Sequence, residues 1–294
     1  VYTSCGISKY YIGERDMIHL KDLGSFESVP ELVTDIINGN ITALESALKN
    51  GLDIHKLIQI GKYSEYSPLQ LALVMNCLPS VKWLVEHGAD LNDKENPSFL
   101  LAVRYGNQEI IAYVVAQGAN INALNSVDVD AFQAALYGKK YENLQLIHDL
   151  GHTVQKYGGR AFRNVITDQD YEVLDFFINN SVDINYNKPD SVYPFKPTPL
   201  CVAARYVDLQ MCKYLVEHGA DVTITEKDGM RPYSIAVEKG DMEMAEYFKN
   251  LEPTEYHDRQ NKMDQLKPFK LPKALISFLE GDNLYFELPD SDFI

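Results

Sequence analysis

The 294-residue sequence has no run of 18 or more apolar residues, so it predicts no membrane-spanning helix. We also expect no secretory signal, because the tyrosine-rich residues 1–11 contain no basic start followed by an apolar block. Basic residues are few: 27 Lys and Arg stand against 42 Asp and Glu, which gives a formal net charge of −15. This charge disfavours nucleic acid and anionic membranes as partners and favours a basic protein. We therefore expect a cytoplasmic protein with a basic protein partner.

The sequence also lacks the motifs of common catalytic and metal sites. No glycine-rich nucleotide loop, HExxH or GxSxG is present. His87 and His218 recur at one position of a repeated EHGAD segment, where a histidine suits the last carbonyls of a helix. We expect no enzyme activity, no metal and no cofactor. Four cysteines without metal-ligand spacing are expected to be buried free thiols: Cys5, Cys77, Cys201 and Cys212.

The strongest positive feature is an internal repeat. TPLCVAARYVDLQMCKYLVEHGADVT at 198–223 matches SPLQLALVMNCLPSVKWLVEHGADLN at 67–92, and weaker copies lie between and around them. The intervals between copies scatter around a period of about 33 residues, which indicates a solenoid. Each copy closes with a glycine or a stand-in, at Gly51, Gly88, Gly118, Gly151, Ser181 and Gly219.

The residues of the best copy predict two helices and a turn. Thr198 and Pro199 suit a helix start, because a hydroxyl caps free N–H groups and proline needs no partner in the first turn. Gly219 suits the left-handed conformation that ends the second helix. Two copies are degenerate: residues 160–161 replace the Thr-Pro start, and the copy at 126–154 lacks it.

On these residues the chain resembles the ankyrin-repeat family over 28–251. The resemblance implies an all-α solenoid of about six to seven helix-turn-helix repeats, and we expect a monomer. The pattern places helix pairs at 28–54, 66–92, 96–122, 130–154, 160–185, 197–223 and 230–251. Residues 1–27 are expected to flank or cap the first repeat, and 252–265 read as a polar linker.

The last segment, 266–294, differs in pattern. Pro272 suits a helix start, Leu275 and Phe278 form an apolar stripe, and a turn precedes an expected strand at 284–288. This short helix-turn-strand segment resembles the opening of a SUKH-superfamily domain, of which the remainder is missing. The alternative is a cap that packs its helix onto the last repeat, because terminal repeats must cover their exposed core face.

The ankyrin resemblance implies a partner-binding groove. In that family the two residues after the alanine pair of each first helix point to the concave surface. The pairs at these positions are 74–75, 104–105, 137–138, 167–168, 205–206 and 238–239. Tyrosine and arginine are frequent among binding hot spots, although these neighbours can also merely stack on one another. The candidate contacts are Met75, Arg104, Tyr105, Tyr137, Asp168, Arg205, Tyr206 and Glu238.

Two further elements are candidate contacts. Acidic residues at two turn tips are expected to meet a basic partner first: Asp93 and Glu95, and Glu226 and Asp228. The connection NYNKPDSVYPFKPT at 185–198 is unusually long, and functional residues gather on such loops. It is either a contact finger, carrying Tyr193 and Phe195, or an accommodated insertion.

These features predict a non-enzymatic protein-binding module. SUKH domains and ankyrin repeats both occur in bacterial immunity proteins, so the two resemblances imply an immunity or inhibitor protein that neutralises a basic toxin. Two alternatives remain open. The chain is a general adaptor or host-directed effector scaffold, or it is the targeting module of a larger enzyme.

Overall fold

The computed structural model describes residues 29–60 and 65–279, and within them helices come in seven consecutive pairs. The first three pairs are α2 (Glu31–Asn38) with α3 (Ile41–Lys49), α4 (Pro68–Val74) with α5 (Leu78–Glu86), and α6 (Ser98–Tyr105) with α7 (Gln108–Ala116). Next come α8 (Ala131–Tyr137) with α9 (Leu144–Asp149), α10 (Val154–Val165) with α11 (Tyr171–Asn179), α12 (Pro199–Arg205) with α13 (Leu209–Glu217), and α14 (Pro232–Glu238) with α15 (Met242–Leu251). Short 3₁₀ turns η1 (Tyr141–Asn143) and η2 (Ile166–Asp168) lie within the fourth and fifth pairs. The predicted all-α solenoid is confirmed.

Side chains at the helix starts explain where the helices begin. Ser67 and Thr198 cap α4 and α12 as hydroxyl acceptors, each followed by proline in the first turn. Most second helices begin after an Asn or Asp whose side chain accepts a backbone N–H of the first turn. The copy expected to lack a start has one, because Asp130 caps α8 and forms a reciprocal capping box with Gln133.

The second helices end as the repeat pattern predicts. All six closing residues have positive φ: 94° at Gly51, 91° at Gly88, 97° at Gly118, 104° at Gly151, 60° at Ser181 and 96° at Gly219. Only glycine adopts this conformation without steric cost, so the recurring glycine reflects backbone geometry.

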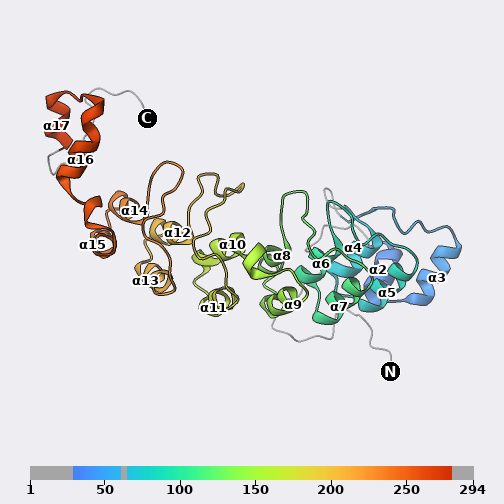
Figure 1. Cartoon of the computed structure of the whole chain (residues 1–294). Helices are drawn as coiled ribbons and strands as arrows, with labels where there is room; N and C mark the ends of the chain where they lie inside the picture. Colours follow the sequence, from blue (N-terminus) through green and yellow to red (C-terminus); the bar gives the residue numbers. More distant parts are fainter. Residues whose placement is uncertain (1–28, 61–64, 280–294) are drawn as a thin grey trace.

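The pairs stack side by side into an elongated array. Figure 1 shows α8, α10, α12 and α14 in one row and α9, α11 and α13 in a second row beneath it. Consecutive first helices contact one another and bury their apolar faces; residues 98–103 of α6 are all buried. The core therefore runs along the whole array, and each pair depends on its neighbours for burial.

Polar side chains join neighbouring pairs to one another. Ser80 donates its hydroxyl to the Ile36 carbonyl at 2.6 Å. Asn143, fully buried, donates to the Val103 carbonyl at 3.1 Å. These bonds satisfy carbonyls at helix ends that would otherwise lack partners.

One predicted boundary is wrong. The fifth pair begins at Val154 and not near residue 160, so only a short turn at 150–153 connects α9 to α10. Gly158 and Gly159 lie buried inside α10, and a Cβ at Gly159 would meet the Tyr186 ring at 2.3 Å. The longer helix takes up residues that form a projecting loop elsewhere.

The loops between other pairs project from the first-helix side of the array, as Figure 1 shows. One carries a minimal antiparallel hairpin, β1 (Ile58–Gln59) with β2 (Glu65–Tyr66), in which Ile58 lies opposite Tyr66. The sequence did not predict these strands. We call the projecting loops fingers.

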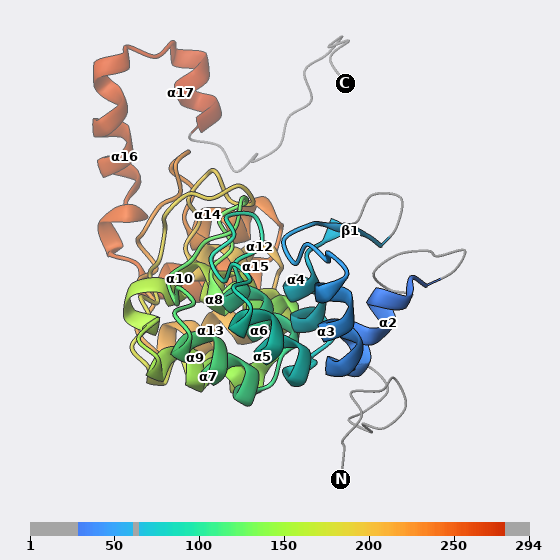
Figure 2. The ribbon, with the colours of Figure 1, turned by 90° about the vertical axis from the view of Figure 1, so that its right-hand side faces the viewer.

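The segment after the last pair differs from the predicted linker. Residues 252–265 contain η3 (Thr254–Tyr256) and most of α16 (Arg259–Leu266), and η4 (Lys267–Phe269) and α17 (Lys273–Leu279) follow. Figures 1 and 2 show α16 and α17 rising away from the stacked pairs. The helix after Pro272 is observed, whereas the predicted strand at 284–288 lies outside the described residues. Residues 1–27 also lie outside them.

Three of the cysteines are buried free thiols, as predicted: Cys77, Cys201 and Cys212. Burial raises the pKa of Cys201 to about 11, so its thiol stays protonated at neutral pH. Cys5 lies outside the described residues. Across 29–60 and 65–279, none of the helices is both long and apolar enough to cross a membrane.

A residue with positive φ gives a test of the turn geometry. Val207 follows α12 at φ 59°, and Gly240 occupies the equivalent place after α14 at φ 72°. Val207→Gly should raise the free energy of unfolding by about 0.5–1 kcal/mol, because a β-branched residue is strained there. Gly240→Val should lower it by about 1–2 kcal/mol, since no atom lies within 4 Å of an added Cβ and only the backbone is strained. Urea unfolding midpoints would measure both, and shifts in the same direction would contradict this account.

Candidate partner-binding surface

The predicted concave residues lie at or just after the C-terminal ends of the first helices or in the turn that follows. Tyr206 is 64% exposed and Tyr137 is 50% exposed, which is unusual for large aromatic side chains. Asp168 and Glu238 are also exposed. Met75 is half-buried and packs against the core. The structure thus places exposed aromatic and acidic side chains along one face of the array.

Arg104 and its neighbours form a stacked cluster. Its guanidinium carbon lies 5.0 Å from the Tyr105 ring centre and 5.9 Å from that of Tyr137. Gly138 sets this spacing, because a Cβ there would lie 1.9 Å from the Arg104 carbonyl oxygen. Gly138 therefore serves close packing between α6 and α8. Burial raises the pKa of Tyr105, with Arg104 opposing and Tyr66 adding to the shift.

Arg205 is held within the chain, although the sequence suggested a partner contact. Its guanidinium forms an ion pair with Glu226, which lies in the finger between α13 and α14. Hydrogen bonding to Glu226 raises the pKa of Arg205, so the guanidinium remains charged. The prediction that Glu226 is exposed is wrong. The residue is only 3% exposed, and its carboxylate is paired with Arg205. The remaining tip acid of this finger, Asp228, is exposed.

The acidic tip at 93–95 borders an open pocket of about 380 Å³ beside the hairpin. Glu65, Asp93 and Glu95 line it, together with Leu57 and Gln70 and two neighbours. Asp93 also accepts the backbone N–H of Glu95 at 3.1 Å, which stabilises the finger. The pocket therefore presents carboxylates to solvent at the first-helix side of the array.

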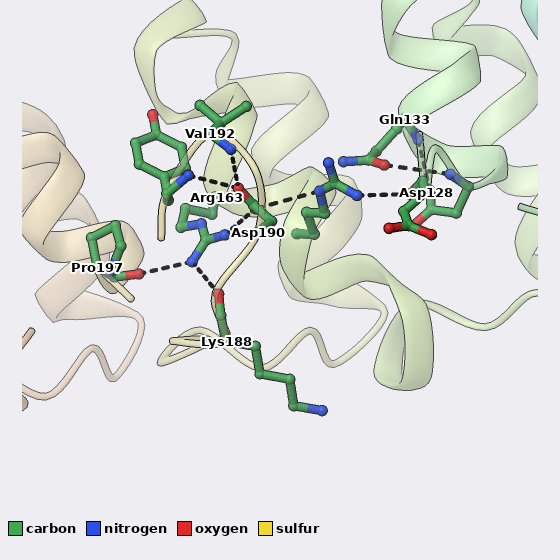
Figure 3. A network of polar contacts seen from close by, with 10 residues as sticks. Asp128, Gln133, Arg163, Lys188, Asp190, Val192 and Pro197 are labelled. Carbon is green, nitrogen blue, oxygen red and sulfur yellow. Dashed lines mark hydrogen bonds and ion pairs between the residues drawn. The ribbon is translucent and has the colours of Figure 1, made fainter. Parts of the chain in front are cut away.

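The long connection at 185–198 is fixed to α10 by one buried arginine. Arg163 is fully buried and donates to the carbonyls of Lys188 at 2.8 Å and Pro197 at 3.1 Å, and to the Asp190 carboxylate. Figure 3 shows these contacts converging on the guanidinium. Its carbon lies 4.9 Å from the Tyr193 ring centre, so Tyr193 serves this network.

Asp190 orders the tip of the same connection. Its carboxylate accepts the backbone N–H groups of Val192 at 2.8 Å and Tyr193 at 2.7 Å. Burial alone would raise the pKa of Asp190, but these N–H groups and Arg163 with Arg160 hold it below its ordinary value. The predicted contact residue Phe195 is half-buried against the Arg205 guanidinium at 5.2 Å. The connection is thus a built part of the array, and no sequence motif indicated Arg163.

The last pair ends in a related cluster. Arg231 donates to both carboxylate oxygens of Glu252, at 2.5 and 3.0 Å, and the carboxylate is 5% exposed. His257 lies 2.8 Å from the same carboxylate, and Tyr256 lies 5.1 Å beneath the guanidinium. These groups join the segment after α15 to the start of α14. No group of three potential metal ligands occurs in the part of the chain that the structure describes.

Comparisons with known proteins agree with this architecture. A family model for ankyrin repeats in three copies matches residues 21–125 and 163–258. Ankyrin repeat and SAM domain-containing protein 6 of Rattus norvegicus is 30% identical over 110 residues, covering 36% of this chain and 10% of that protein. An ankyrin repeat protein of Acanthamoeba polyphaga mimivirus is 43% identical over 42 residues, 14% of this chain and 32% of that protein. The chain therefore spans less than a third of the length of either relative.

Two solved structures share the fold. The human ASB11 ankyrin repeat domain aligns with a TM-score of 0.57 at 16% identity, over 76% of this chain and 99% of that chain. The second is a chain from the complex of a predatory endopeptidase from Bdellovibrio bacteriovorus with an immunity protein. It aligns with a TM-score of 0.51 at 20% identity, over 63% of this chain and 97% of that chain.

Removing the buried arginine should unfold the long connection. Arg163→Ala leaves the Lys188 and Pro197 carbonyls without this donor and Asp190 with Arg160 as its remaining arginine, and we expect a loss of about 3–5 kcal/mol in unfolding free energy. Arg163→Lys should restore only part of it, because an ammonium cannot reproduce the planar set of donors. Urea unfolding would measure this, and a loss below about 1 kcal/mol for Arg163→Ala, as at a surface pair, would contradict it.

A buried cap gives a pH-dependent prediction. Burial raises the pKa of Asp130 from 3.8 to about 6, against the opposing Gln133 N–H and Arg160. A raised carboxyl pKa means that the folded state binds the proton more tightly, so stability falls as pH rises from about 4 to 6. Asp130→Asn keeps the cap without a charge. The unfolding free energy of Asp130→Asn relative to that of the unchanged protein should therefore rise by up to about 3 kcal/mol between about pH 4 and 6. A difference that does not change with pH would contradict the raised pKa of Asp130.

Proposed function

The chain belongs to the ankyrin-repeat family and is a protein-binding module; from this we propose that it is a bacterial immunity protein that binds and neutralises a basic toxin. Ankyrin-repeat proteins are generally non-catalytic, and the proposed protein inhibits by occupying its partner. One structure with the same fold is a chain of a complex between an endopeptidase and an immunity protein. This similarity supports an immunity role as a candidate.

The observation that carries the proposal is the acid-lined pocket beside the hairpin. Within the described residues, the Glu65 and Glu95 carboxylates form no hydrogen bond or ion pair with the chain, so both are available to a cation. A lysine or arginine side chain of a partner fits such a pocket in both charge and size. The surface then selects basic partners over acidic ones.

The overall charge supports the same partner chemistry. A formal charge of −15 attracts a basic protein over a distance of about one Debye length and raises the association rate. The proposal places the protein in the cytoplasm as a monomer, where its three buried thiols would stay reduced. The SUKH-like reading of 266–294 remains a prediction.

Co-expression with the product of each adjacent gene tests the proposed function. Cell survival and the activity of that product in vitro are the two readouts. Protection together with loss of activity on binding supports an immunity protein. Binding without loss of activity would identify an adaptor instead, and lack of protection against every adjacent product would contradict the immunity role.

Neutralising the pocket should weaken the complex. The double change Glu65→Gln and Glu95→Gln should lower affinity about tenfold or more and reduce its salt dependence, because two charge-assisted contacts are lost. Calorimetry at two ionic strengths would measure both effects.

A control pair separates the pocket from net charge. Glu172 and Glu243 lie exposed on the second helices α11 and α15. The double change Glu172→Gln and Glu243→Gln alters the net charge by the same amount as the pocket pair. We expect these to alter affinity less than about threefold, as exposed charges outside a contact do. Equal effects of the two pairs would show that only long-range charge matters.

A further inference from the structure

Two copies of the repeat carry the same arginine at the same place. Arg104 and Arg205 occupy equivalent positions near the ends of α6 and α12, each followed by a tyrosine. The finger residues Asn125 and Glu226 follow their arginines at the same separation of 21 residues. These two residues are therefore candidates for equivalent positions.

The backbone of the two fingers confirms the equivalence. Asn125 N–H donates to Val129 O at 3.2 Å, and Glu226 N–H donates to Met230 O at 2.7 Å. In each finger the residue three positions later donates its backbone N–H to the carbonyl of the first: Asp128 to Asn125 and Gly229 to Glu226, both at 3.0 Å. Both donors have positive φ, 60° at Asp128 and 86° at Gly229. Asn125 thus stands where Glu226 stands in the later finger.

The side chains at these positions differ in what they bind. Glu226 neutralises Arg205, whereas Asn125 turns to its own finger and accepts the N–H groups of Val127 at 3.1 Å and Val129 at 2.9 Å. The Arg104 guanidinium consequently forms no hydrogen bond or ion pair with the residues the structure describes. Its Nε atom is buried and has no acceptor.

The surroundings of Arg104 favour an external acceptor. Tyr105 and Tyr137 lie within cation–π distance of the guanidinium and restrict its motion. A positioned guanidinium has several N–H donors in one plane, the arrangement that binds a carboxylate through two parallel hydrogen bonds. Tyr137, 50% exposed, adds apolar surface beside it.

We infer that Arg104 is a carboxylate-binding site, at which an acidic group of the partner protein is bound between Tyr105 and Tyr137. The inference rests on the proposed function in that a partner supplies the carboxylate. The same chemistry comes from an Asp or Glu side chain or from a chain terminus. In either case the site binds an acidic group within a protein that is otherwise acidic.

The test needs no partner. Arginine side-chain ¹⁵N NMR of the full chain would follow the Arg104 Nε–H signal during titration with N-acetyl-glutamate N-methylamide, whose only charge is a side-chain carboxylate. N-acetylalanine, in a second arm, presents a terminal carboxylate, and N-acetyl-glutamine N-methylamide is the neutral control. A saturable shift with one or both carboxylates and none with the amide is the expected result, and the stronger arm identifies the source.

A variant can install the missing internal partner. Asn125→Glu places a carboxylate where Glu226 has one, so Arg104 should become paired within the chain and its apparent affinity for the probe should fall about tenfold. Asn125→Gln, of equal length and uncharged, should keep the affinity. Arg104→Gln should remove the response, and circular dichroism would confirm folding of all three.

Two results would overturn the inference. One is the lack of a saturable shift with either carboxylate, or an equal shift with the neutral amide, and the other is an unchanged response in an Asn125→Glu variant in which Arg104 has formed the new ion pair. Because the probe is a small molecule, these outcomes are independent of the toxin test. Failure of the immunity role would leave the carboxylate site intact, and the reverse also holds.

Discussion

The structure depends on one constraint: no helix pair can bury its apolar face alone. First helices are covered by the first helices before and after them, so nearly all of α4, α6 and α12 is buried. Conformational entropy is recovered only when neighbours stack, which is why the pairs share one continuous core. Variation is then confined to helix ends and fingers, and those are the places where recognition can differ.

Within that constraint, buried and half-buried arginines fix segments that lie outside the stacked helices. Arg163, Arg205 and Arg231 each bind a carboxylate from a later segment, and two of these pairs share the separation of 21 residues. A finger has few apolar contacts of its own, so a charge-assisted bond to a packed helix gives it a fixed conformation. The longest finger, at 185–198, is held in this way by the fully buried Arg163 of α10.

The recurring features of the repeat could be predicted from the sequence, whereas features that occur in only one repeat were missed. The closing residues at 51 to 219 were identifiable because the left-handed turn recurs and selects glycine. The early start of α10 was missed because the repeat pattern placed the helix start at 160–161, whereas the helix begins at Val154 and Gly159 within it admits the Tyr186 ring. The predicted contact residues follow from the repeat pattern and lie at the ends of the first helices, but the pairing of Arg205 depends on a contact across 21 residues. Spacing alone cannot separate a bound arginine from a free one.

The difference between bound and free arginines explains how an acidic protein can bind in one orientation. Long-range attraction from a charge of −15 is screened beyond roughly 8 Å at physiological ionic strength, so it would bring the proposed basic partner near without aligning it. Alignment requires short-range groups of unlike sign. The pocket at Glu65 and Glu95 would accept a cation, and Arg104 would accept an anion. A partner rotated out of place would set like charges against each other at both points, and such repulsion is an effective source of specificity.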